Sequence, residues 1–413
     1  MKALDLDFRE WLERVERDEE LRHLATTHPF RFLLKIGDAR LLWEVEPHGI
    51  RLEEELNIDH NWDFTLVIPP DAWSRFCQPR PPRFHNTLQA MIAMVPGVAV
   101  EGSRLAWAQS AHTVERILLN ARRERREPDP ADAEFAPETI TGRYVTASAG
   151  GDPYVMYYET AGEGHPVVFL HTAGSDSRQY KYLLGNRDLQ RLASMYAFDL
   201  PYHGRSEPPD GWWTRPYRLT VDLYAEWIFA FLKAAGLYDR KPIICGSSMG
   251  GAMVLYLAAN FGELFQAAIS IEGGFGTAGR RLIAWTNHPQ VHAGYFLPTW
   301  VAGTMSPDSP EYYRRLTLWQ YAQGGPGVYQ GDTAAGAHFH RAFQNIGRAK
   351  CPLWILSGEY DYSTTSEMSK EAAERMGGTF VPMEGIGHFP MSEHPKRFLH
   401  HFRPVLEQAL RSR

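Results

Sequence analysis

Hydrophobic residues in this chain gather in short, nearly continuous runs with polar and glycine-rich segments between them. Five such runs lie in the carboxyl-terminal part, at 167–170, 243–245, 267–271, 352–357 and 379–383. Short apolar runs bounded by turn residues are typical of buried strands. A helical stretch at 252–260 follows the second run closely. The pattern predicts an α/β domain with a mostly parallel sheet and helices on both faces.

The first 121 residues show a different order of elements. Apolar positions recur at helical spacing over 5–25, and strand-like runs follow at 30–36, 41–45 and 64–68. A last helix is predicted over 105–120. A small α+β domain is therefore expected ahead of the α/β domain.

A charged segment separates these two patterns. Residues 122–137 are rich in arginine, acidic residues and proline and have no apolar periodicity, which is typical of a linker. The predicted organisation is a domain over 1–121, a linker over 122–137 and a domain over 138–413. Two domains also fit a length of 413 residues, which exceeds what one core usually accommodates.

Composition then narrows the classes of protein. A formal charge of −6 with 22% charged residues offers no basic surface for nucleic acid. Since no apolar run of about 18 residues and no secretory signal occur, we expect no membrane span and a cytoplasmic location. Cys245 and Cys351 lie at or beside predicted buried strands and are expected to be reduced packing thiols. No metal-ligand spacing or cofactor fingerprint occurs, so neither a metal nor a cofactor is expected.

The clearest chemical signal is the pentapeptide 246–250, Gly-Ser-Ser-Met-Gly. It joins the apolar run 243–245 to the helical stretch that follows. Glycines on either side allow backbone and helix to crowd together, so that the hydroxyl of Ser248 projects from a tight strand-to-helix turn. Ser248 is therefore a candidate nucleophile.

A candidate acid and a candidate base follow the serine along the chain. Asp361 lies on the loop after the run 352–357, and His388 lies on a glycine-rich loop after the run 379–383. We interpret His388 as the general base and Asp361 as the residue that orients it. Glu272, after the run 267–271, is the alternative acid, although a turn carboxylate is the preferred interpretation.

The loop after the run 167–170 begins His171-Thr172-Ala173-Gly174, and the segment 198–206 ends in His-Gly-Arg-Ser. With the serine, acid and histidine motifs, these segments resemble the α/β-hydrolase superfamily over about residues 138–413. The resemblance implies an α/β-hydrolase fold with a helical lid. It also implies an oxyanion hole formed by the backbone amides of Met249 and Ala173. Thr172 stands where that superfamily usually has glycine, and because a β-branched residue tolerates positive φ poorly, the choice between Ala173 and Thr172 as donor stays open.

The amino-terminal pattern is similar to the sterol-carrier-protein-like domain. The points of similarity are a strand that begins at 63–65, a short helix at 70–76, and a strand at 98–102 before the last helix. The resemblance implies an α+β module with an apolar tunnel that captures lipophilic ligands. The alternative is a packing or dimerisation module, through which the protein would form a homo-oligomer. Because no residue marks a ligand contact, the alternative is favoured.

A lid is expected at about 273–345. This range lies in the insertion between the run 267–271 and the run 352–357. This insertion is rich in aromatic residues, histidine and proline, which predicts short, broken helices. Aromatic rings with polar groups are typical of small-molecule sites. We interpret the following residues as candidates for the substrate pocket: His171, Thr172, Trp285, His292, Tyr295, Trp300 and Trp319.

These features together predict a serine hydrolase of carboxylic esters, lactones or related acyl compounds, acting on an apolar, aromatic small molecule through an acyl-enzyme on Ser248. A carbon-carbon bond hydrolase of the meta-cleavage type is one alternative, because Ser-Met-Gly-Gly at 248–251 resembles that family too. That reaction would need a lid arginine, for which the candidates are Arg280, Arg281, Arg314 and Arg315. An acyltransferase and a non-catalytic lipid-binding scaffold are also compatible with the sequence.

Overall fold

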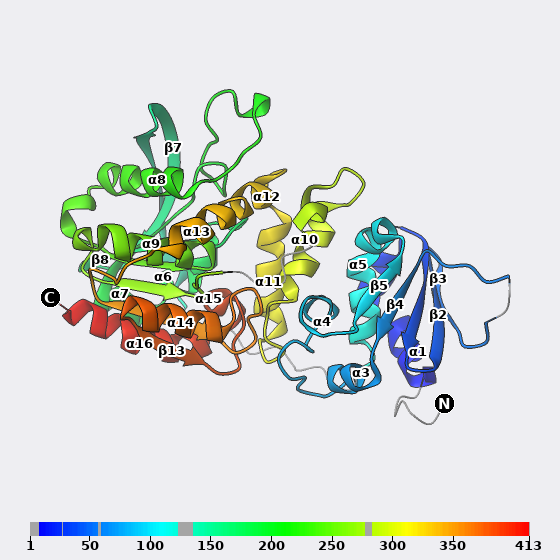
Figure 1. The fold of residues 1–413 in the computed structure, drawn as a ribbon. Helices are drawn as coiled ribbons and strands as arrows, with labels where there is room; N and C mark the ends of the chain where they lie inside the picture. Colours follow the sequence, from blue (N-terminus) through cyan, green and yellow to red (C-terminus); the bar gives the residue numbers. More distant parts are fainter. Residues whose placement is uncertain (1–7, 27, 57–58, 123–134, 277–282, 413) are drawn as a thin grey trace. The chain divides into compact units, whose positions relative to one another are not determined.

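The structure, a computed structural model, describes residues 8–26, 28–56, 59–122, 135–276 and 283–412. The chain forms two compact units (Figure 1). Unit 1 comprises Met1–Arg126 and Arg281–Gly303, and unit 2 comprises Glu127–Arg280 and Thr304–Arg413. Most of the linker predicted at 122–137 lies outside the described residues.

Unit 2 is built on an eight-stranded sheet. Its strands are β6 (Thr141–Ala149), β7 (Asp152–Ala161), β8 (His165–Leu170), β9 (Ala193–Phe198), β10 (Ile243–Ser247), β11 (Ala268–Ile271), β12 (Leu353–Gly358) and β13 (Thr379–Met383). They are arranged in the order β13-β12-β11-β10-β8-β9-β7-β6. Neighbouring strands from β13 to β9 are parallel, while β7 is antiparallel to both β9 and β6. The mostly parallel α/β sheet predicted from the apolar runs is confirmed.

Side chains of β8 show how the sheet is buried on both faces. Val168 and Leu170 join the apolar cluster formed with helices α8 (Val221–Ala234) and α9 (Met249–Phe261). Val167 and Phe169, which point to the opposite face, join a cluster with α16 (Pro395–Arg411). Because β8 lies in the middle of the sheet and is buried on both faces, its sequence is a continuous apolar run.

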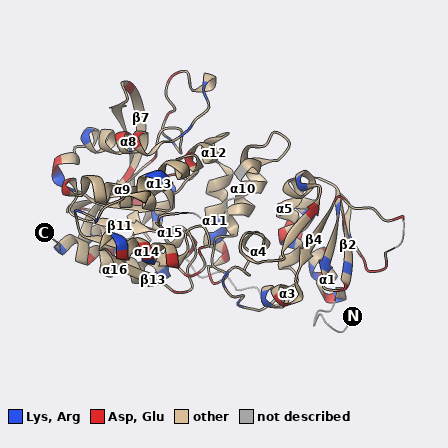
Figure 2. Ribbon diagram, viewed as in Figure 1, with Lys and Arg blue, Asp and Glu red and all other residues tan. Residues whose placement is uncertain are grey.

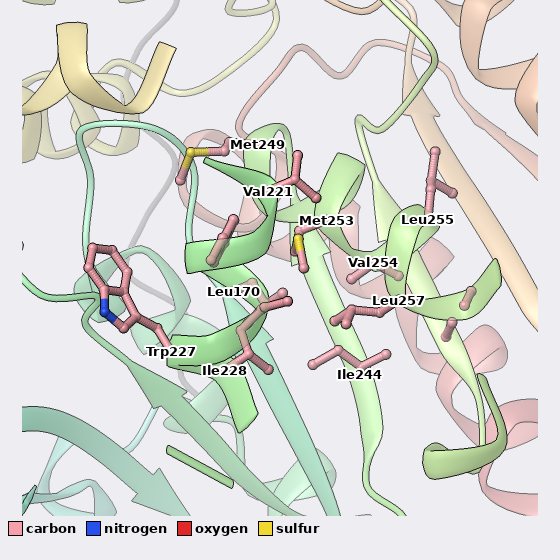
Figure 3. Close-up of a cluster of buried hydrophobic side chains, with 14 of the residues drawn as sticks. Leu170, Val221, Trp227, Ile228, Ile244, Met249, Met253, Val254, Leu255 and Leu257 are labelled. Carbon is pink, nitrogen blue, oxygen red and sulfur yellow. The ribbon is translucent and has the colours of Figure 1, made fainter. Parts of the chain in front are cut away.

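Figure 3 shows the first of these clusters around α9. Met253 and Leu257 of α9 lie with Ile228 of α8 and Ile244 of β10, and all four side chains are fully buried. Helix α9 carries no charged residue, so apolar side chains are available on the faces turned to the sheet and to α8. This packing anchors the helix that begins directly after Ser248.

The remaining helices of unit 2 flank the sheet or lie in the insertion between β11 and β12. They are η1 (Pro137–Thr139), η2 (Ser177–Tyr180), α6 (Lys181–Leu184), α7 (Arg187–Leu192), η3 (Trp212–Thr214), η4 (Tyr238–Arg240), η5 (Gly262–Leu264), α11 (Glu311–Ala322), α12 (Val328–Thr333), α13 (Ala335–Gln344), α14 (Ser366–Met376) and α15 (Pro390–Glu393). Three of them, α11 to α13, fall within the insertion where short helices were predicted. Acidic and basic positions occur together along the outer helices α14 and α16 (Figure 2).

Unit 1 contains a five-stranded sheet in the order β3-β2-β1-β4-β5. Its strands are β1 (Phe30–Ile36), β2 (Ala39–Glu46), β3 (Gly49–Glu53), β4 (Phe64–Ile68) and β5 (Ala99–Gly102). Its helices are α1 (Phe8–Arg17), α2 (Glu19–Ala25), α3 (Pro70–Phe76), α4 (Leu88–Met94) and α5 (Arg104–Leu119). The strand β4 is parallel to β1, whereas the other pairs are antiparallel.

Several elements of unit 1 differ from the prediction, among them α4, which was not predicted. The stretch 5–25 was expected to be one helix, but α1 ends at Arg17 and α2 begins at Glu19. Asp18 causes the break, because its carboxylate accepts hydrogen bonds from the amides of Glu20 and Leu21 and so caps the second helix. The edge strand β3 was not predicted, since only Ile50 of its side chains is buried.

A segment of the insertion belongs to unit 1. Residues 281–303, which include η6 (Ile283–Asn287) and α10 (Ala293–Ala302), were expected to form part of the hydrolase lid. In the structure, Phe296 of α10 meets the ring of Trp107 of α5 edge to face, with 6.0 Å between the ring centroids. Tyr295 stacks on His112 of the same helix at 4.7 Å. The physical reason for the difference is that these apolar side chains complete the core of unit 1.

This packing leads to a prediction about stability. Phe296 is 1% exposed, so Phe296→Ala should lower the free energy of unfolding of unit 1 by about 3–5 kcal/mol. The change is to be measured by guanidinium unfolding followed by fluorescence. Trp213→Ala, which truncates an aromatic side chain that is 67% exposed, serves as the control and should leave the transition where it is. Equal transitions in both variants would contradict the packing of α10 in this core.

Candidate active site

The predicted site residues follow four of the five neighbouring parallel strands β13-β12-β11-β10-β8 of unit 2. The loop 171–175 follows β8, Ser248 follows β10, Asp361 follows β12, and His388 follows β13. Carboxyl ends of parallel strands meet at one edge of the sheet, where α/β proteins usually form their sites. The order of the strands therefore brings together side chains that lie far apart in the sequence.

Ser248 lies on a strained turn between β10 and α9. Its φ of 54° and ψ of −111° are unusual for a residue with a side chain. The flanking glycines make the turn possible: a Cβ on Gly246 would lie 2.5 Å from the carbonyl oxygen of Gly250, and a Cβ on Gly250 would overlap the carbonyl of Leu170. Any larger residue at either position would push α9 away from the sheet.

Ser248, His388 and Asp361 form a continuous chain of hydrogen bonds. The Oγ of Ser248 lies 2.8 Å from Nε2 of His388. The Nδ1 of the same ring lies 2.6 Å from Oδ2 of Asp361, to which it donates. All three side chains are buried, at 6%, 5% and 0% exposure. With Nδ1 protonated toward the carboxylate, Nε2 is free to accept the serine proton.

The second oxygen of Asp361 is also engaged. Its Oδ1 accepts hydrogen bonds from the backbone amides of Ser363 and Thr364, at 2.7 and 3.2 Å. These bonds stabilise the ionised carboxylate in a place where it is shielded from water. They also fix its orientation toward His388.

Glu272, the alternative acid, lies beside Asp361, and in the described part of the chain no hydrogen bond joins it to His388. Its two carboxyl oxygens accept from the amide of Gly358 at 2.8 and 3.0 Å, and its Oε2 lies 3.5 Å from the hydroxyl of Ser357. Burial and the neighbouring Asp361 raise the pKa of Glu272 well above its usual range. The neutral form of Glu272 is therefore favoured beside Asp361.

The loop that carries His388 is held by another buried carboxyl group. Glu393 of α15 accepts from the amides of Gly387 and Ser306, at 2.6 and 3.0 Å. Burial raises the pKa of Glu393 to about 7. The amide of His388 itself donates to the carbonyl of Thr304 at 3.0 Å. The position of the imidazole therefore depends on contacts with residues 304–306, where the chain enters unit 2 again after residue 303.

Some backbone amides around the candidate site donate hydrogen bonds within the protein, and others do not. In the loop 171–175, the amide of Thr172 donates to the Gln179 side chain at 3.1 Å, and the amide of Gly174 donates to Asp332 at 2.7 Å. For the amides of Ala173 and Met249, no acceptor is present among the described residues. Two donors are thus left, one on the loop after β8 and one at the start of α9.

The loop tolerates threonine because it does not place positive φ at that position. Among the described residues, the positive φ of this loop falls on Gly174, at 69°, and not on Thr172. A glycine is required there, since a Cβ would also approach the ring of Tyr329 to 2.6 Å. The loop conformation left open by the sequence is therefore compatible with Thr172.

His171 is in the loop but is packed as a structural residue. It is 1% exposed, with Nδ1 2.8 Å from the carbonyl of Thr172 and Nε2 accepting from the amide of Leu200 at 3.2 Å. Burial, followed by the nearby His203, lowers its pKa to about 4. The ring is therefore neutral and has no free nitrogen for a ligand.

Most of the other pocket candidates do not belong to unit 2, which carries Ser248. Trp285, His292, Tyr295 and Trp300 lie in the segment that folds with unit 1. Trp319 is in unit 2, but its side chain is 62% exposed. Their interpretation as pocket residues therefore rests on the sequence alone.

The lid arginines are only partly described. Arg280 and Arg281 lie outside the described residues, and Arg315 pairs with Glu311 one helical turn away on an exposed face. Arg314 lowers the pKa of Glu393 through its charge, although burial has the larger, opposite effect.

Among the described residues, no group of three or more His, Cys, Asp or Glu side chains is arranged to hold a metal ion. In the same part of the chain, no helix combines the length and the apolar character needed to cross a bilayer.

Three side chains at the site were not predicted: Gln179, Asp332 and Glu393. Each contacts a backbone amide of the loops that carry the predicted residues. Glu393 has a local signal, because it lies five residues after His388 at the end of a short helix. Gln179 lies only seven residues after Thr172, but no motif marks it. Asp332 has no local signal, since its contact with Gly174 joins segments 158 residues apart.

Comparisons with known proteins agree with the fold of unit 2. The family described as "Alpha/beta hydrolase family" matches residues 167–401, which is more than half of the chain. No curated protein sequence matches the chain.

Several solved structures share the fold. A thermophilic esterase from Thermogutta terrifontis is 19% identical, with a TM-score of 0.52, and 65% of this chain covers 99% of it. The enol-lactonase from Burkholderia xenovorans LB400 is 17% identical at a TM-score of 0.51, covering 63% and 99%. A haloalkane dehalogenase from Agrobacterium tumefaciens C58 is 16% identical at 0.50, covering 65% and 97%. At these identities the likeness concerns the fold, which hosts different reactions. By its family match, this chain belongs to the alpha/beta hydrolase family.

Proposed function

We propose that this protein is a serine hydrolase that cleaves a carboxylic ester, lactone or related acyl bond of an apolar, aromatic small molecule. The observation that carries the proposal is the chain of hydrogen bonds from Ser248 through His388 to Asp361, at 2.8 and 2.6 Å. It starts at a strained, buried serine, which is the arrangement of an activated nucleophile.

In the first half of the reaction, Ser248 Oγ attacks the carbonyl carbon while its proton passes to Nε2 of His388. The tetrahedral intermediate collapses, and the imidazolium returns that proton to the departing alcohol oxygen. A water molecule then attacks the acyl-enzyme, with His388 as its base, and releases the acid and free Ser248. Asp361 stays ionised throughout and stabilises the imidazolium.

The negative charge that develops on the carbonyl oxygen needs hydrogen-bond donors. We assign this role to the amides of Ala173 and Met249, which have no acceptor among the described residues. The neighbouring amides of Thr172 and Gly174 are already bound to Gln179 and Asp332. Such preorganised donors commonly contribute a factor of about 10²–10³ each to the rate.

The surroundings of the imidazole support an apolar, aromatic substrate. The ring of Phe389 lies 4.8 Å from that of His388, and the ring of Tyr321 lies 5.4 Å from Phe389. Both aromatic side chains are 3% exposed. Rings in this position favour apolar groups next to the reacting bond.

A first prediction concerns the nucleophile. A fluorophosphonate probe should form one adduct per chain on Ser248, located by intact mass and peptide mapping. Ser248→Ala should take no probe and lose hydrolysis of p-nitrophenyl butyrate by at least about 10⁴-fold, because the attacking oxygen is gone.

The matched control for this variant is Ser247→Ala. Ser247 is adjacent in the chain and fully buried, and its hydroxyl has no hydrogen-bond partner among the described residues. This variant should still take the probe on Ser248. An unlabelled wild-type protein, or full turnover in Ser248→Ala, would refute the proposed function.

A second prediction separates the two carboxyl groups. Asp361→Asn should lower kcat by about 10⁴-fold, because an amide no longer favours the productive tautomer of His388 or stabilises the imidazolium. Glu272→Gln should lower kcat by less than about 10-fold, because glutamine has nearly the size of a neutral carboxylic acid and likewise places no charge beside Asp361. Steady-state kinetics of both variants decide the matter. A larger loss in Glu272→Gln than in Asp361→Asn would make Glu272 the acid.

A further inference from the structure

Asp332 takes no part in the proposed reaction steps, yet both oxygens of its carboxylate accept hydrogen bonds. It lies on α12, within the insertion, and its carboxylate is fully buried. Its Oδ2 accepts from the amide of Gly174 at 2.7 Å and lies 2.8 Å from Nε2 of His203. Its Oδ1 accepts from the hydroxyl of Tyr217 at 2.6 Å.

The partner His203 must be charged. Its Nε2 faces the carboxylate of Asp332, and its Nδ1 lies 3.0 Å from the carbonyl oxygen of Pro201. Both nitrogens face acceptors, so both carry a proton. Burial works against this charge, but Asp332 outweighs it and raises the pKa of His203 above its usual value. In return, the imidazolium overcomes the effect of burial on Asp332 and lowers the pKa of that carboxyl group.

The ion pair lies directly against the loop 171–175. The ring of His203 packs on that of His171, with 4.8 Å between centroids. Gly174 is held at its amide by Asp332 and approached over its Cα by the ring of Tyr329, also from α12. The neighbouring Thr172 is held at its amide by Gln179 and through its hydroxyl by Tyr321 of α11. Ala173 therefore lies between two residues whose amides are both fixed by side chains.

We propose that Asp332, paired with His203, is a positioning residue for catalysis: it fixes the peptide after Ala173 so that the Ala173 amide points at the developing oxyanion. Helix α12 then supplies part of the oxyanion hole indirectly, and the lid takes part in transition-state stabilisation as well as covering the site. This inference rests on the proposed function, because it assigns Ala173 as a donor in acyl transfer. A peptide amide rotates about the bonds on either side of it, so restraining Gly174 restrains the direction of the donor before it.

The test compares Asp332→Asn and Asp332→Ala with wild type on p-nitrophenyl butyrate. Asparagine keeps the size of the side chain but has one acceptor oxygen and one amide NH₂ group for the three donors, and alanine removes both acceptor oxygens. We expect kcat to fall about 10- to 100-fold in these variants, less than the 10²–10³ typical when an oxyanion donor is lost outright. The KM should stay within about 2-fold, because the Ala173 amide acts more strongly on the transition state than on the bound ester.

A second readout distinguishes positioning from general damage. A trifluoromethyl ketone forms a charged adduct with Ser248 that needs the oxyanion hole, whereas the corresponding methyl ketone mimics the neutral ground state. Affinity for the trifluoromethyl ketone should fall by about the same factor as kcat/KM, while affinity for the methyl ketone should not change. Thr333→Ala is the matched control on α12, since its hydroxyl bonds only to Gln330 within the helix, and it should behave as wild type.

The outcomes separate this inference from the proposed function. Wild type without turnover or probe labelling would overturn the function. An active wild type with Asp332 variants that match it in kcat and in trifluoromethyl ketone affinity would overturn the inference alone. Equal losses for both ketones would overturn it too, because a loosened fold weakens both. If Asp332→Ala does not fold, the comparison is made on Asp332→Asn, whose melting temperature is measured beside that of Thr333→Ala.

Discussion

Unit 2 depends on one close approach of backbone to backbone, where α9 meets the strands β8 and β10. The glycines at 246 and 250 let the helix begin so near the sheet that any Cβ would collide with a carbonyl oxygen. This contact forces Ser248 into a strained conformation and directs the hydroxyl toward His388. The apolar side chains of α9 hold the helix there against the strain, so the site depends on the packing beneath it.

Buried acids around the site have different charges because they have different neighbours. Asp361 receives backbone amides and a histidine, whereas Glu272 lies against Asp361 and remains protonated. Asp332 is ionised because both nitrogens of His203 beside it face acceptors and carry protons. Burial works against charge on each of these carboxyl groups, so the neighbouring groups decide which of them is ionised.

The sequence was informative where the determinants are local. Ser248, Asp361 and His388 lie in short motifs at the ends of apolar strands, and both the sheet and the meeting of these residues followed from those runs. Asp332 could not be found this way, because its partners lie more than one hundred residues away in the chain. The break at Asp18 was missed because apolar spacing continues across it, while the cap depends on one side-chain conformation.

The aromatic residues of 281–303 were assigned to a lid because of their place between two strands. Apolar periodicity indicates that a residue is buried, but it does not indicate in which of the two cores the residue lies. Phe296 and Tyr295 pack on Trp107 and His112, so the partners of these residues were decided by tertiary packing.

The same segment has a consequence for synthesis on the ribosome. Domains near the amino terminus usually fold while the rest of the chain is still being made. Here the first unit lacks part of its core until residue 303 has left the exit tunnel, so its folding is completed only after most of the sheet strands of the second unit have been synthesised.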